Sequence, residues 1–368
     1  MYLEELSRVG LRALALVTDA FGGSGGIARY NRDFLTALAD TDSVSEVVVL
    51  PRLRSPSCES LPYKIRQLPA AVTKTAYATS ALLSIIRNGP FDLVFCGHLF
   101  MSPLAILLAR LVRAPLWIQV HGFEAWAQPS LSMRLSTERA DLVTSVSRYT
   151  RHRLLSWSDI VPSRVRVLPN TVSDRYKPGA KPEYLSERYG LTSKKVLLTV
   201  SRLVATEGYK GHDRVIVALP GVLLRQPNTV YVVAGDGDDR PRLERLAVEK
   251  GVSQSIRFVG SVSDIELIDY YHMADVFVMP STGEGFGIVF LEAAASGLPV
   301  IGGNRDGSFD ALAEGAIGVA IDPNDPKKLI SAICAALDGS GNTTALRIDR
   351  FSKENFTTHV AELTRNIT

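Results

Sequence analysis

Short apolar segments rich in β-forming residues recur along the whole chain, and stretches with helical spacing of apolar residues separate them. Several of these segments are continuous apolar runs, such as Val47-Val48-Val49-Leu50, rather than alternating ones. Continuous runs are typical of strands that are buried on both faces of a parallel sheet. The expected strands are residues 12–18, 46–50, 91–97, 115–121, 141–147, 164–168, 195–202, 229–234, 255–259, 274–280, 298–302 and 318–321.

The alternation of strands and helices occurs twice, which predicts an α/β fold with two similar halves. Apolar residues have helical spacing in 27–38, and again in 215–223 after the first strand of the second half. We therefore expect two doubly wound, Rossmann-like domains, 1–172 and 173–350, with linker-like residues in 176–182. Ligands of such sheets bind beyond the carboxyl ends of strands, so two facing domains would form a cleft.

Composition is that of a folded globular protein, since 46% of the 368 residues are hydrophobic and 21% are charged. Three widely spaced cysteines and six scattered histidines offer no metal-binding cluster, so no metal is expected. No secretory signal pattern is present, and the apolar run 99–112 is shorter than the roughly 20 residues that span a bilayer. We expect a cytoplasmic protein in which 99–112 is a buried helix.

Basic residues outnumber acidic ones in 1–172, whereas acidic residues predominate in the remainder. The excess is compatible with peripheral contact of the first domain with the cytoplasmic face of a membrane, or with an ordinary solvated surface. Segment 52–74 mixes basic and apolar residues and is the candidate for such contact. No dense basic run interleaved with aromatics predicts nucleic-acid binding.

A glycine-rich loop, Gly22-Gly23-Ser24-Gly25-Gly26, stands between the first expected strand and the first helix. Gly23, Gly25 and Gly26 would let backbone amides approach a phosphate at a helix N-terminus. The dinucleotide fingerprint fits poorly, because the second strand ends in Leu50-Pro51 without the acidic residue that binds a ribose. Phosphate or acceptor contact is the favoured interpretation, and a plain flexible loop is the alternative.

Two further polar motifs follow expected strands. His121-Gly122 ends the fourth strand, where the imidazole could hydrogen-bond a sugar, although a structural histidine is about as common. Arg202 and Lys210 follow the first strand of the second half and precede a helix, a place where two cations could neutralise a diphosphate. The alternative is two ordinary surface cations. We assign no site to Lys181, Lys194 and Lys195, which are expected to form a solvated face.

The segment 280–293 carries the most specific pattern, with two glutamates around glycines that open a helix. Glu284 and Glu292 would stand on the order of 12 Å apart at a rise of 1.5 Å per residue. That exceeds the roughly 5–9.5 Å between the two carboxyl groups of a glycosidase. They are better interpreted as hydroxyl anchors at the two ends of one ligand, with the amides of the loop and the helix dipole directed at phosphates between them. Phe286, Gly287 and Ile288 are the candidate donor-binding residues of this loop. The alternative is capping and surface glutamates.

The string from Glu284 to Glu292 resembles the spaced-glutamate motif of retaining glycosyltransferases with the GT-B fold, in family four. The likeness covers nearly the whole chain, and 351–368 resembles the final helix that crosses back onto the first domain in that family. Departures occur at 206–209 and 302–308, where donor contacts could differ. The other matching stretches are the glycine loop, His121-Gly122, 167–170, Arg202 with Lys210-Gly211, 234–237, 258–260 and 297–301.

The resemblance implies sugar transfer with retention and without a metal ion. Arg202 and Lys210 would hold the diphosphate of the donor, and Glu292 would bind the ribose. Glu284, with the amides of Phe286 and Gly287, would bind the donor sugar.

In the first domain, by the same resemblance, His121 would contact the sugar near its reacting carbon. The glycines from Gly23 to Gly26 would close over the phosphates or sugar, and residues around Gly260 would touch the base. No side chain is an evident nucleophile, so attack on the face that the diphosphate leaves is the expected route.

The expected function is transfer of a hexose, with GDP-mannose favoured and a UDP-hexose possible, to a saccharide or lipid-linked acceptor. A role in surface polysaccharide or glycolipid synthesis follows from the resemblance. A sugar-nucleotide epimerase and a non-catalytic nucleotide-sugar-binding module are the two alternatives. The epimerase would convert the donor without an acceptor, and the binding module would bind it without transfer.

Overall fold

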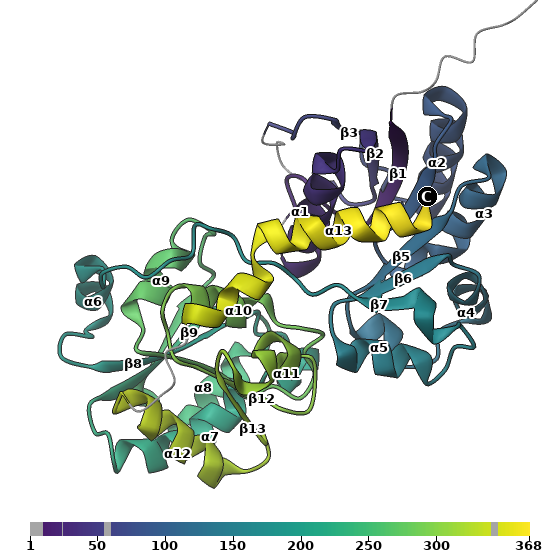
Figure 1. Cartoon of the computed structure of the whole chain (residues 1–368). Helices are drawn as coiled ribbons and strands as arrows, with labels where there is room; N and C mark the ends of the chain where they lie inside the picture. The colour runs from purple at the N-terminus through teal and green to yellow at the C-terminus, as the bar shows by residue number, and fades with distance from the viewer. Residues whose placement is uncertain (1–9, 24, 55–59, 340–344) are drawn as a thin grey trace, which may run out of the picture. The chain divides into compact units, whose positions relative to one another are not determined.

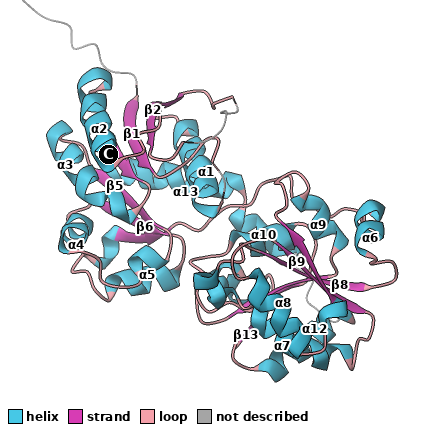
Figure 2. Ribbon diagram, turned by 180° about the vertical axis from the view of Figure 1, so that it is seen from behind, coloured by secondary structure: helices cyan, strands magenta, loops and turns pink. Residues whose placement is uncertain are grey.

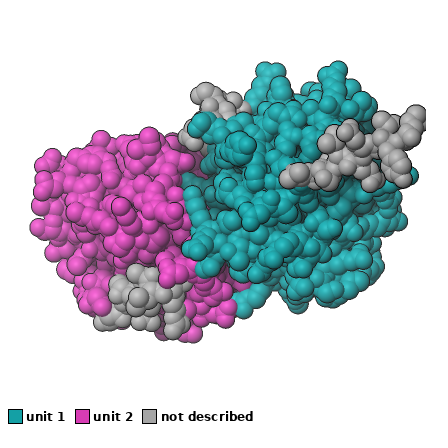
Figure 3. All heavy atoms as spheres, turned by 45° about the horizontal axis from the view of Figure 1, so that its top comes forward, with its two compact units in different colours: residues 1–171, 353–368 teal, residues 172–352 magenta. Residues whose placement is uncertain are grey.

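The computed structural model describes residues 10–23, 25–54, 60–339 and 345–368. The chain divides into two compact units, which Figure 3 distinguishes by colour. Unit 1 comprises residues 1–171 together with 353–368, and unit 2 comprises 172–352. Each unit has its own parallel sheet, and Figure 2 shows the strands of each sheet with helices around them. The two doubly wound α/β units confirm the expected fold class.

The described residues of unit 1 form a seven-stranded parallel sheet with strand order β3-β2-β1-β4-β5-β6-β7. The strands are β1 (Leu11–Val17), β2 (Val44–Pro51), β3 (Ile65–Gln67), β4 (Leu93–Cys96), β5 (Leu116–Val120), β6 (Leu142–Ser145) and β7 (Val165–Val167). Its helices are α1 (Gly26–Asp40), α2 (Lys74–Asn88), α3 (Ser102–Val112), α4 (Leu131–Glu138), α5 (Arg148–Leu155) and α13 (Lys353–Ile367).

Alternating side chains of the unit 1 strands pack against helices on opposite faces of the sheet, as period-2 geometry requires. On β4, Val94 and Cys96 join the core cluster that includes residues of α2 and α3. Phe95, between them, stacks on Phe34 of α1 with ring centroids 4.1 Å apart, and the Trp117 ring meets Phe34 edge-on. Both faces are therefore covered, which explains the continuous apolar runs in β1, β2 and β4.

The described residues of unit 2 form a six-stranded parallel sheet with strand order β10-β9-β8-β11-β12-β13. The strands are β8 (Lys195–Val200), β9 (Thr229–Ala234), β10 (Ile256–Gly260), β11 (Val276–Met279), β12 (Val300–Gly303) and β13 (Val319–Ile321). Its helices are α6 (Glu183–Tyr189), α7 (His212–Leu223), α8 (Arg240–Glu249), α9 (Leu267–Met273), α10 (Ile288–Ala295), α11 (Ser308–Ala311) and α12 (Pro326–Leu337).

Two sequence-based expectations need correction. The sequence pattern missed β3, because this edge strand has three residues and Ile65 is its one buried apolar side chain. The helix expected to be buried in 99–112 is α3 with a preceding 3₁₀ turn, and it is partly exposed, since Leu107 and Leu111 are 49% and 56% exposed. Among the described helices, none is both long and apolar enough to cross a membrane.

The last helix, α13, packs against α1 within unit 1 (Figure 1). Phe356 meets the ring of Tyr30 edge-on, with centroids 6.0 Å apart, and Val360 and Thr364 are fully buried. Buried residues at 356, 360 and 364 recur every fourth position, so α13 presents one apolar stripe to the unit. The C-terminal helix therefore contributes to the core of the unit that begins with the N-terminal half of the chain.

We predict that Phe356→Ala destabilises unit 1 by about 3 kcal/mol, because it removes a buried aromatic ring and leaves a cavity under α13. The unfolding midpoint of unit 1 should fall by roughly 6–12 °C, measured by thermal denaturation. His359→Ala, an exposed position on the same helix, is the control and should change the midpoint little. Equal midpoints for the two variants would contradict the packing role of α13.

Candidate functional site

In unit 2, the loops that follow the carboxyl ends of β8 and β11 are held together by close backbone contacts. The amide of Thr282 donates to the carbonyl of Tyr209 over 2.9 Å. Gly211 has φ +84°, and a Cβ there would lie 2.4 Å from the carbonyl oxygen of Pro280. A side chain at Gly283 would likewise collide with the ring of Tyr209. Glycine is required at these close approaches, and the two loops are held edge to edge.

Lys210 and Glu284 meet where these loops join. The Lys210 Nζ lies 2.6 Å from Glu284 Oε1, and the two side chains are 13% and 14% exposed. Neighbouring strands β8 and β11 bring together residues that are 74 positions apart in the sequence. The structure thus places two of the predicted site residues in direct contact.

Arg202 is linked to this pair by Glu207, a residue that the sequence did not identify as a candidate. Its Nη2 lies 2.5 Å from Glu207 Oε1, and the other oxygen of Glu207 lies 3.8 Å from Lys210 Nζ. The Arg202 side chain is 75% exposed, whereas Glu207 is 16% exposed. Glu207 belongs to the 206–209 departure. Its acidic side chain between two cations was the sequence signal that could have identified it.

Asp306 is a second functional candidate that the sequence analysis missed. Its Oδ2 accepts hydrogen bonds of 2.6 Å from the amide of Glu284 and from Ser281 Oγ, and its Oδ1 accepts from the amide of Ser308. The residue is 2% exposed. This buried carboxylate fixes the backbone that carries Glu284. The signal was an Asp-Gly pair shortly after a buried strand, within the 302–308 departure.

Helix α10 begins beside Glu284 without a side-chain cap at its N-terminus. Gly287 is the N-cap at φ +87°, and no side chain caps the helix. Phe286 is 3% exposed, and its ring meets Phe351 edge-on at 5.8 Å. Ile288 is the first helical residue. Uncapped amides at a helix start attract an anion through hydrogen bonding and the helix dipole.

Glu292 lies one turn further along α10 and is 1% exposed. Its Oε2 accepts a hydrogen bond of 2.8 Å from the hydroxyl of Tyr271, whose ring in turn packs edge-on against Tyr176. The predicted ribose anchor is therefore held inside unit 2 by a tyrosine on α9. Its predicted role stays a prediction.

Gly260, the predicted base contact, ends β10 at φ +78° with open space around its Cβ position. Its carbonyl accepts from the amide of Gly235 over 2.8 Å, which joins the ends of β9 and β10. The residue thus lies at the carboxyl edge of the same sheet as Arg202 and Glu284.

In unit 1, His121 follows β5 and is held by its neighbours. Its Nε2 lies 2.9 Å from the carbonyl oxygen of Gly97, and its amide donates to Glu124. Because a carbonyl only accepts, Nε2 carries the proton, and Nδ1 is the nitrogen that could accept from a ligand hydroxyl. Burial lowers the pKa of His121 to about 4, so the ring is neutral at pH 7.

His98 lies next to His121, although the sequence analysis did not select it. The two rings are 6.1 Å apart, and His98 is 7% exposed at the end of β4. Its Nδ1 accepts a hydrogen bond from the amide of Phe100, and burial lowers its pKa. A histidine that follows a buried strand was the available signal, the same signal that identified His121.

The glycine loop precedes α1, and Ser24 lies outside the described residues. A Cβ at Gly23 would collide with the side chain of Asp19, which would have to move to accommodate it. Gly25 has φ +90° and is the N-cap of α1, which begins at Gly26 without a side-chain cap. The backbone therefore leaves amides of a 15-residue helix available, which suits the predicted contact with an anion.

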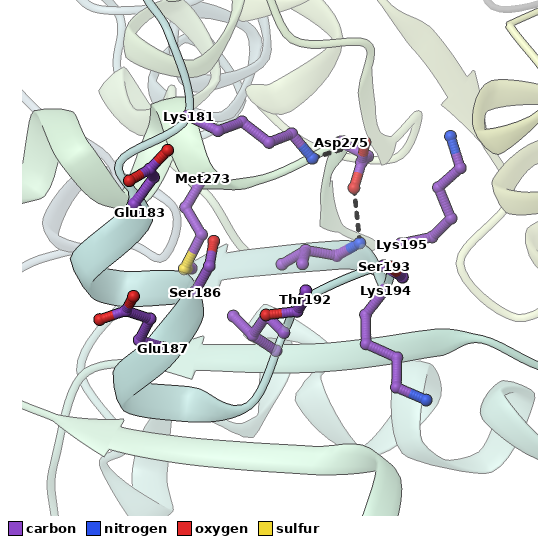
Figure 4. A pocket seen from close by; sticks show the side chains of 12 residues that line it. Lys181, Glu183, Ser186, Glu187, Thr192, Ser193, Lys194, Lys195, Met273 and Asp275 are labelled. Atoms are coloured by element: carbon purple, nitrogen blue, oxygen red, sulfur yellow. Dashed lines mark hydrogen bonds and ion pairs between the residues drawn. The ribbon is translucent and has the colours of Figure 1, made fainter.

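A cavity of about 710 Å³ lies elsewhere in unit 2, at the opposite edge of the sheet (Figure 4). Its lining includes Lys194 and Lys195, where β8 begins, whereas Arg202 follows the end of that strand. Lys181 is paired there with Asp275 over 2.8 Å. Like the sequence, the structure gives these lysines no link to the predicted donor residues.

The basic segment 52–74 is partly engaged in internal contacts. Lys64 donates to the carbonyl of Ala39, and Arg66 pairs with Glu46 over 2.9 Å. Residues 55–59 lie outside the described part of the chain. Within the described ranges, no group of three or more His, Cys, Asp or Glu residues is arranged to hold a metal ion.

The chain is similar to known proteins along most of its length. Residues 24–176 match the family Glycosyltransferase Family 4, and residues 185–354 match Glycosyl transferases group 1. The chain is 34% identical over 342 residues to the GDP-mannose-dependent alpha-(1-6)-phosphatidylinositol monomannoside mannosyltransferase of Mycolicibacterium smegmatis. That similarity covers 87% of this chain and 88% of the relative.

Solved structures show the same fold at low sequence identity. Anabaena HepE in complex with UDP superposes with a TM-score of 0.74 at 19% identity, and the match covers 97% of this chain and 100% of the HepE chain. Sucrose-phosphate synthase from Thermosynechococcus elongatus gives a TM-score of 0.75 at 21% identity, covering 96% of this chain and 98% of that chain. These two likenesses concern the fold alone.

We predict that acid weakens unit 1 through His121. Its pKa is about 4 in the folded chain, below the ordinary value of 6.5, so between these values the unfolded chain binds a proton that the folded chain does not. Stability that is present above pH 6.5 is lost as the pH falls toward 4, by at most about 3 kcal/mol. In urea unfolding at pH 7.5 and 5.0, His121→Gln should lose about 2 kcal/mol less than wild type.

One other titrating group in unit 1 contributes to the background of this measurement. Burial raises the pKa of Asp33 to about 6, so this group in unit 1 acts in the opposite direction, but equally in both proteins. His359→Gln, at an exposed position, should lose as much stability as wild type. An identical loss for His121→Gln and wild type would contradict the prediction.

Proposed function

Because this chain belongs to the group 1 glycosyltransferases, the GT-B enzymes of family four, we propose that it transfers a hexose from a nucleoside-diphosphate sugar to a saccharide or lipid-linked acceptor. Family membership confirms the resemblance drawn from the spaced glutamates. The observation that carries the proposal is the contact of Lys210 with Glu284 beside the uncapped start of α10.

We propose that the donor binds at the carboxyl edge of the unit 2 sheet. Lys210 and Arg202 would neutralise the diphosphate, and the amides at Gly287 and Ile288 would add hydrogen bonds to it. Glu284 would bind the hydroxyl groups of the sugar, and Glu292 those of the ribose. Gly260, whose Cβ position is open, would allow the base to approach the backbone.

The chemistry follows from the charge that the diphosphate acquires as it leaves. The bond between the anomeric carbon and the phosphate oxygen breaks, and the oxygen keeps the electron pair. Lys210 and the amides, which are held in place, would stabilise that charge with little reorganisation, together with Arg202, which exchanges its partner Glu207 for the diphosphate. A metal ion has this role in other transferases. We propose metal-independent transfer with retention, in which the diphosphate on the same face accepts the proton of the attacking hydroxyl. His121 would accept a hydrogen bond at Nδ1 from a hydroxyl of the sugar.

GDP-mannose is the donor that we propose first, with mannose as the transferred sugar. The relative from Mycolicibacterium smegmatis is named for that donor and for a phosphatidylinositol mannoside acceptor. UDP is the nucleotide bound in the Anabaena structure, so a UDP-hexose is the second candidate. The acceptor would then be a glycolipid or saccharide used in building surface polysaccharide or glycolipid.

We also propose that unit 1 contacts an anionic membrane surface through the neighbouring helices α2 and α3. Both helices expose apolar residues beside cations, the combination that favours a lipid interface. The exposed apolar residues are Leu82, Leu83, Ile86, Leu107 and Leu111, and the exposed cations are Arg87, Arg110 and Arg113. Peripheral binding at the cytoplasmic face would bring the enzyme to a lipid-linked acceptor.

The function is tested by release of GDP or UDP from nucleotide sugars in the presence of EDTA and candidate acceptors. We predict that Lys210→Ala and Glu284→Ala each reduce transfer about 10²–10³-fold, because each removes a contact to the group on which charge develops or to the sugar. Lys194→Ala, at the opposite edge of the same sheet, is the matched control and should retain wild-type activity.

Other outcomes would separate the alternatives. Conversion of the donor without an acceptor would support an epimerase, and tight binding without any conversion would support a binding module. Loss of activity in EDTA that added metal restores would contradict metal independence. Near-wild-type transfer by Lys210→Ala would contradict the assigned site.

Membrane contact is tested by sedimentation with vesicles of phosphatidylcholine and phosphatidylglycerol. We predict that the double substitution Leu107→Gln and Leu111→Gln lowers vesicle affinity at least tenfold, since two apolar side chains no longer enter the interface. Leu224→Gln, an 88% exposed leucine in unit 2, should bind as wild type does. Equal affinity of the double variant and wild type would contradict the assignment to α3.

A further inference from the structure

Glu207 lies between the two cations that are assigned to the donor diphosphate. It belongs to the 3₁₀ helix Ala205–Lys210 (η4) and interrupts that helix with φ −107° and ψ 24°. Its Oε1 accepts from Arg202, and its Oε2 lies 3.8 Å from Lys210 Nζ, too far for a hydrogen bond. Oε2 is buried and accepts no hydrogen bond from any residue in the described ranges.

The charges around Lys210 already balance before any ligand binds. Arg202 and Lys210 face Glu207 and Glu284, so two cations are paired with two carboxylates. Burial raises the pKa of the neighbouring Tyr209 hydroxyl, and the negative charges of Glu284 and Glu207 raise it further. A diphosphate that enters this site meets cations that are already engaged.

The two partners of the Arg202–Glu207 pair differ in their freedom to move. Arg202 is an exposed side chain on a long flexible stem, while the carboxylate of Glu207 is largely buried. Binding of a diphosphate would therefore exchange the partner of Arg202, and the buried carboxylate would remain beside the new anion. Like charges at such a distance repel, and the repulsion is stronger in a partly buried site than in water.

We infer that Glu207 is a built-in counter-ion of the donor site, which competes with the diphosphate for Arg202 and weakens binding of the nucleoside-diphosphate product. This inference rests on the proposed function. In the transfer, the bond from the anomeric carbon to the phosphate oxygen breaks, and the acceptor oxygen bonds to that carbon and gives up its proton. At pH 8 the proton ends in water, so the product carries one more negative charge than the diphosphate of the donor. Glu207 consequently opposes the product more than the donor and favours product release.

The test is calorimetric titration of wild type and Glu207→Gln with GDP and with UDP at pH 8 in EDTA. For the nucleotide that wild type binds, Glu207→Gln should bind roughly tenfold more tightly in 50 mM salt, because a repulsive charge has been removed. The gain should be smaller for the matching nucleotide sugar, and it should shrink in 500 mM salt. Glu207→Asp, which keeps the charge, should show no such gain.

Glu187→Gln is the matched control, because it makes the same change in net charge on the opposite edge of the sheet. Unchanged or weaker product binding by Glu207→Gln would overturn the inference, as would an equal gain for Glu187→Gln. Circular dichroism of each variant separates these results from misfolding, and the behaviour of Glu207→Asp tests the charge independently. If wild type bound neither nucleotide, the proposed function would fail together with the inference. If wild type bound one and Glu207→Gln gained nothing, the inference alone would fail.

Discussion

The backbone contact between the Lys210 loop and the loop after β11 is the constraint on which the unit 2 site depends. Gly211 fits against the carbonyl of Pro280, and Tyr209 accepts the amide of Thr282, so neither loop can shift without the other. A buried carboxylate, Asp306, holds the Glu284 backbone from the other side. A cation and a carboxylate are thereby held 2.6 Å apart on two rigid supports rather than on free loops.

The sequence predicted the fold well, because both sheets are parallel and covered on both faces. Such strands need apolar residues on both faces, and the resulting continuous apolar runs are visible in a single sequence. The edge strand β3 was not predicted because it has one buried side chain, Ile65, which is too few to produce a recognisable hydrophobic pattern. Helix α3 was expected to be buried because its composition is apolar, whereas exposure depends on which helices surround it, and that is a tertiary property.

The candidate site was predictable where a residue lies in the loop that follows a strand end within a recognisable motif, as Arg202, His121 and Glu284 do. Asp306 and Glu207 carried only a weak signal in the sequence, because their importance lies in partners that folding alone supplies. The sequence does not show whether a loop carboxylate contacts water, a backbone amide or a guanidinium group. Side chains that organise a site through other side chains are therefore the part that a single sequence conceals.

Helix α13 has a consequence for how the chain acquires its structure during synthesis. Unit 2 is one uninterrupted segment, 172–352, whereas unit 1 is completed by residues 353–368. Translation produces every residue of unit 2 before it produces Phe356, Val360 and Thr364, the apolar stripe of α13 that packs against α1. The first half of the nascent chain thus keeps an uncovered apolar face until residues 353–368 have been synthesised. Loss of residues 353–368 would keep Arg202 and Lys210 and still leave the first unit without one of its helices.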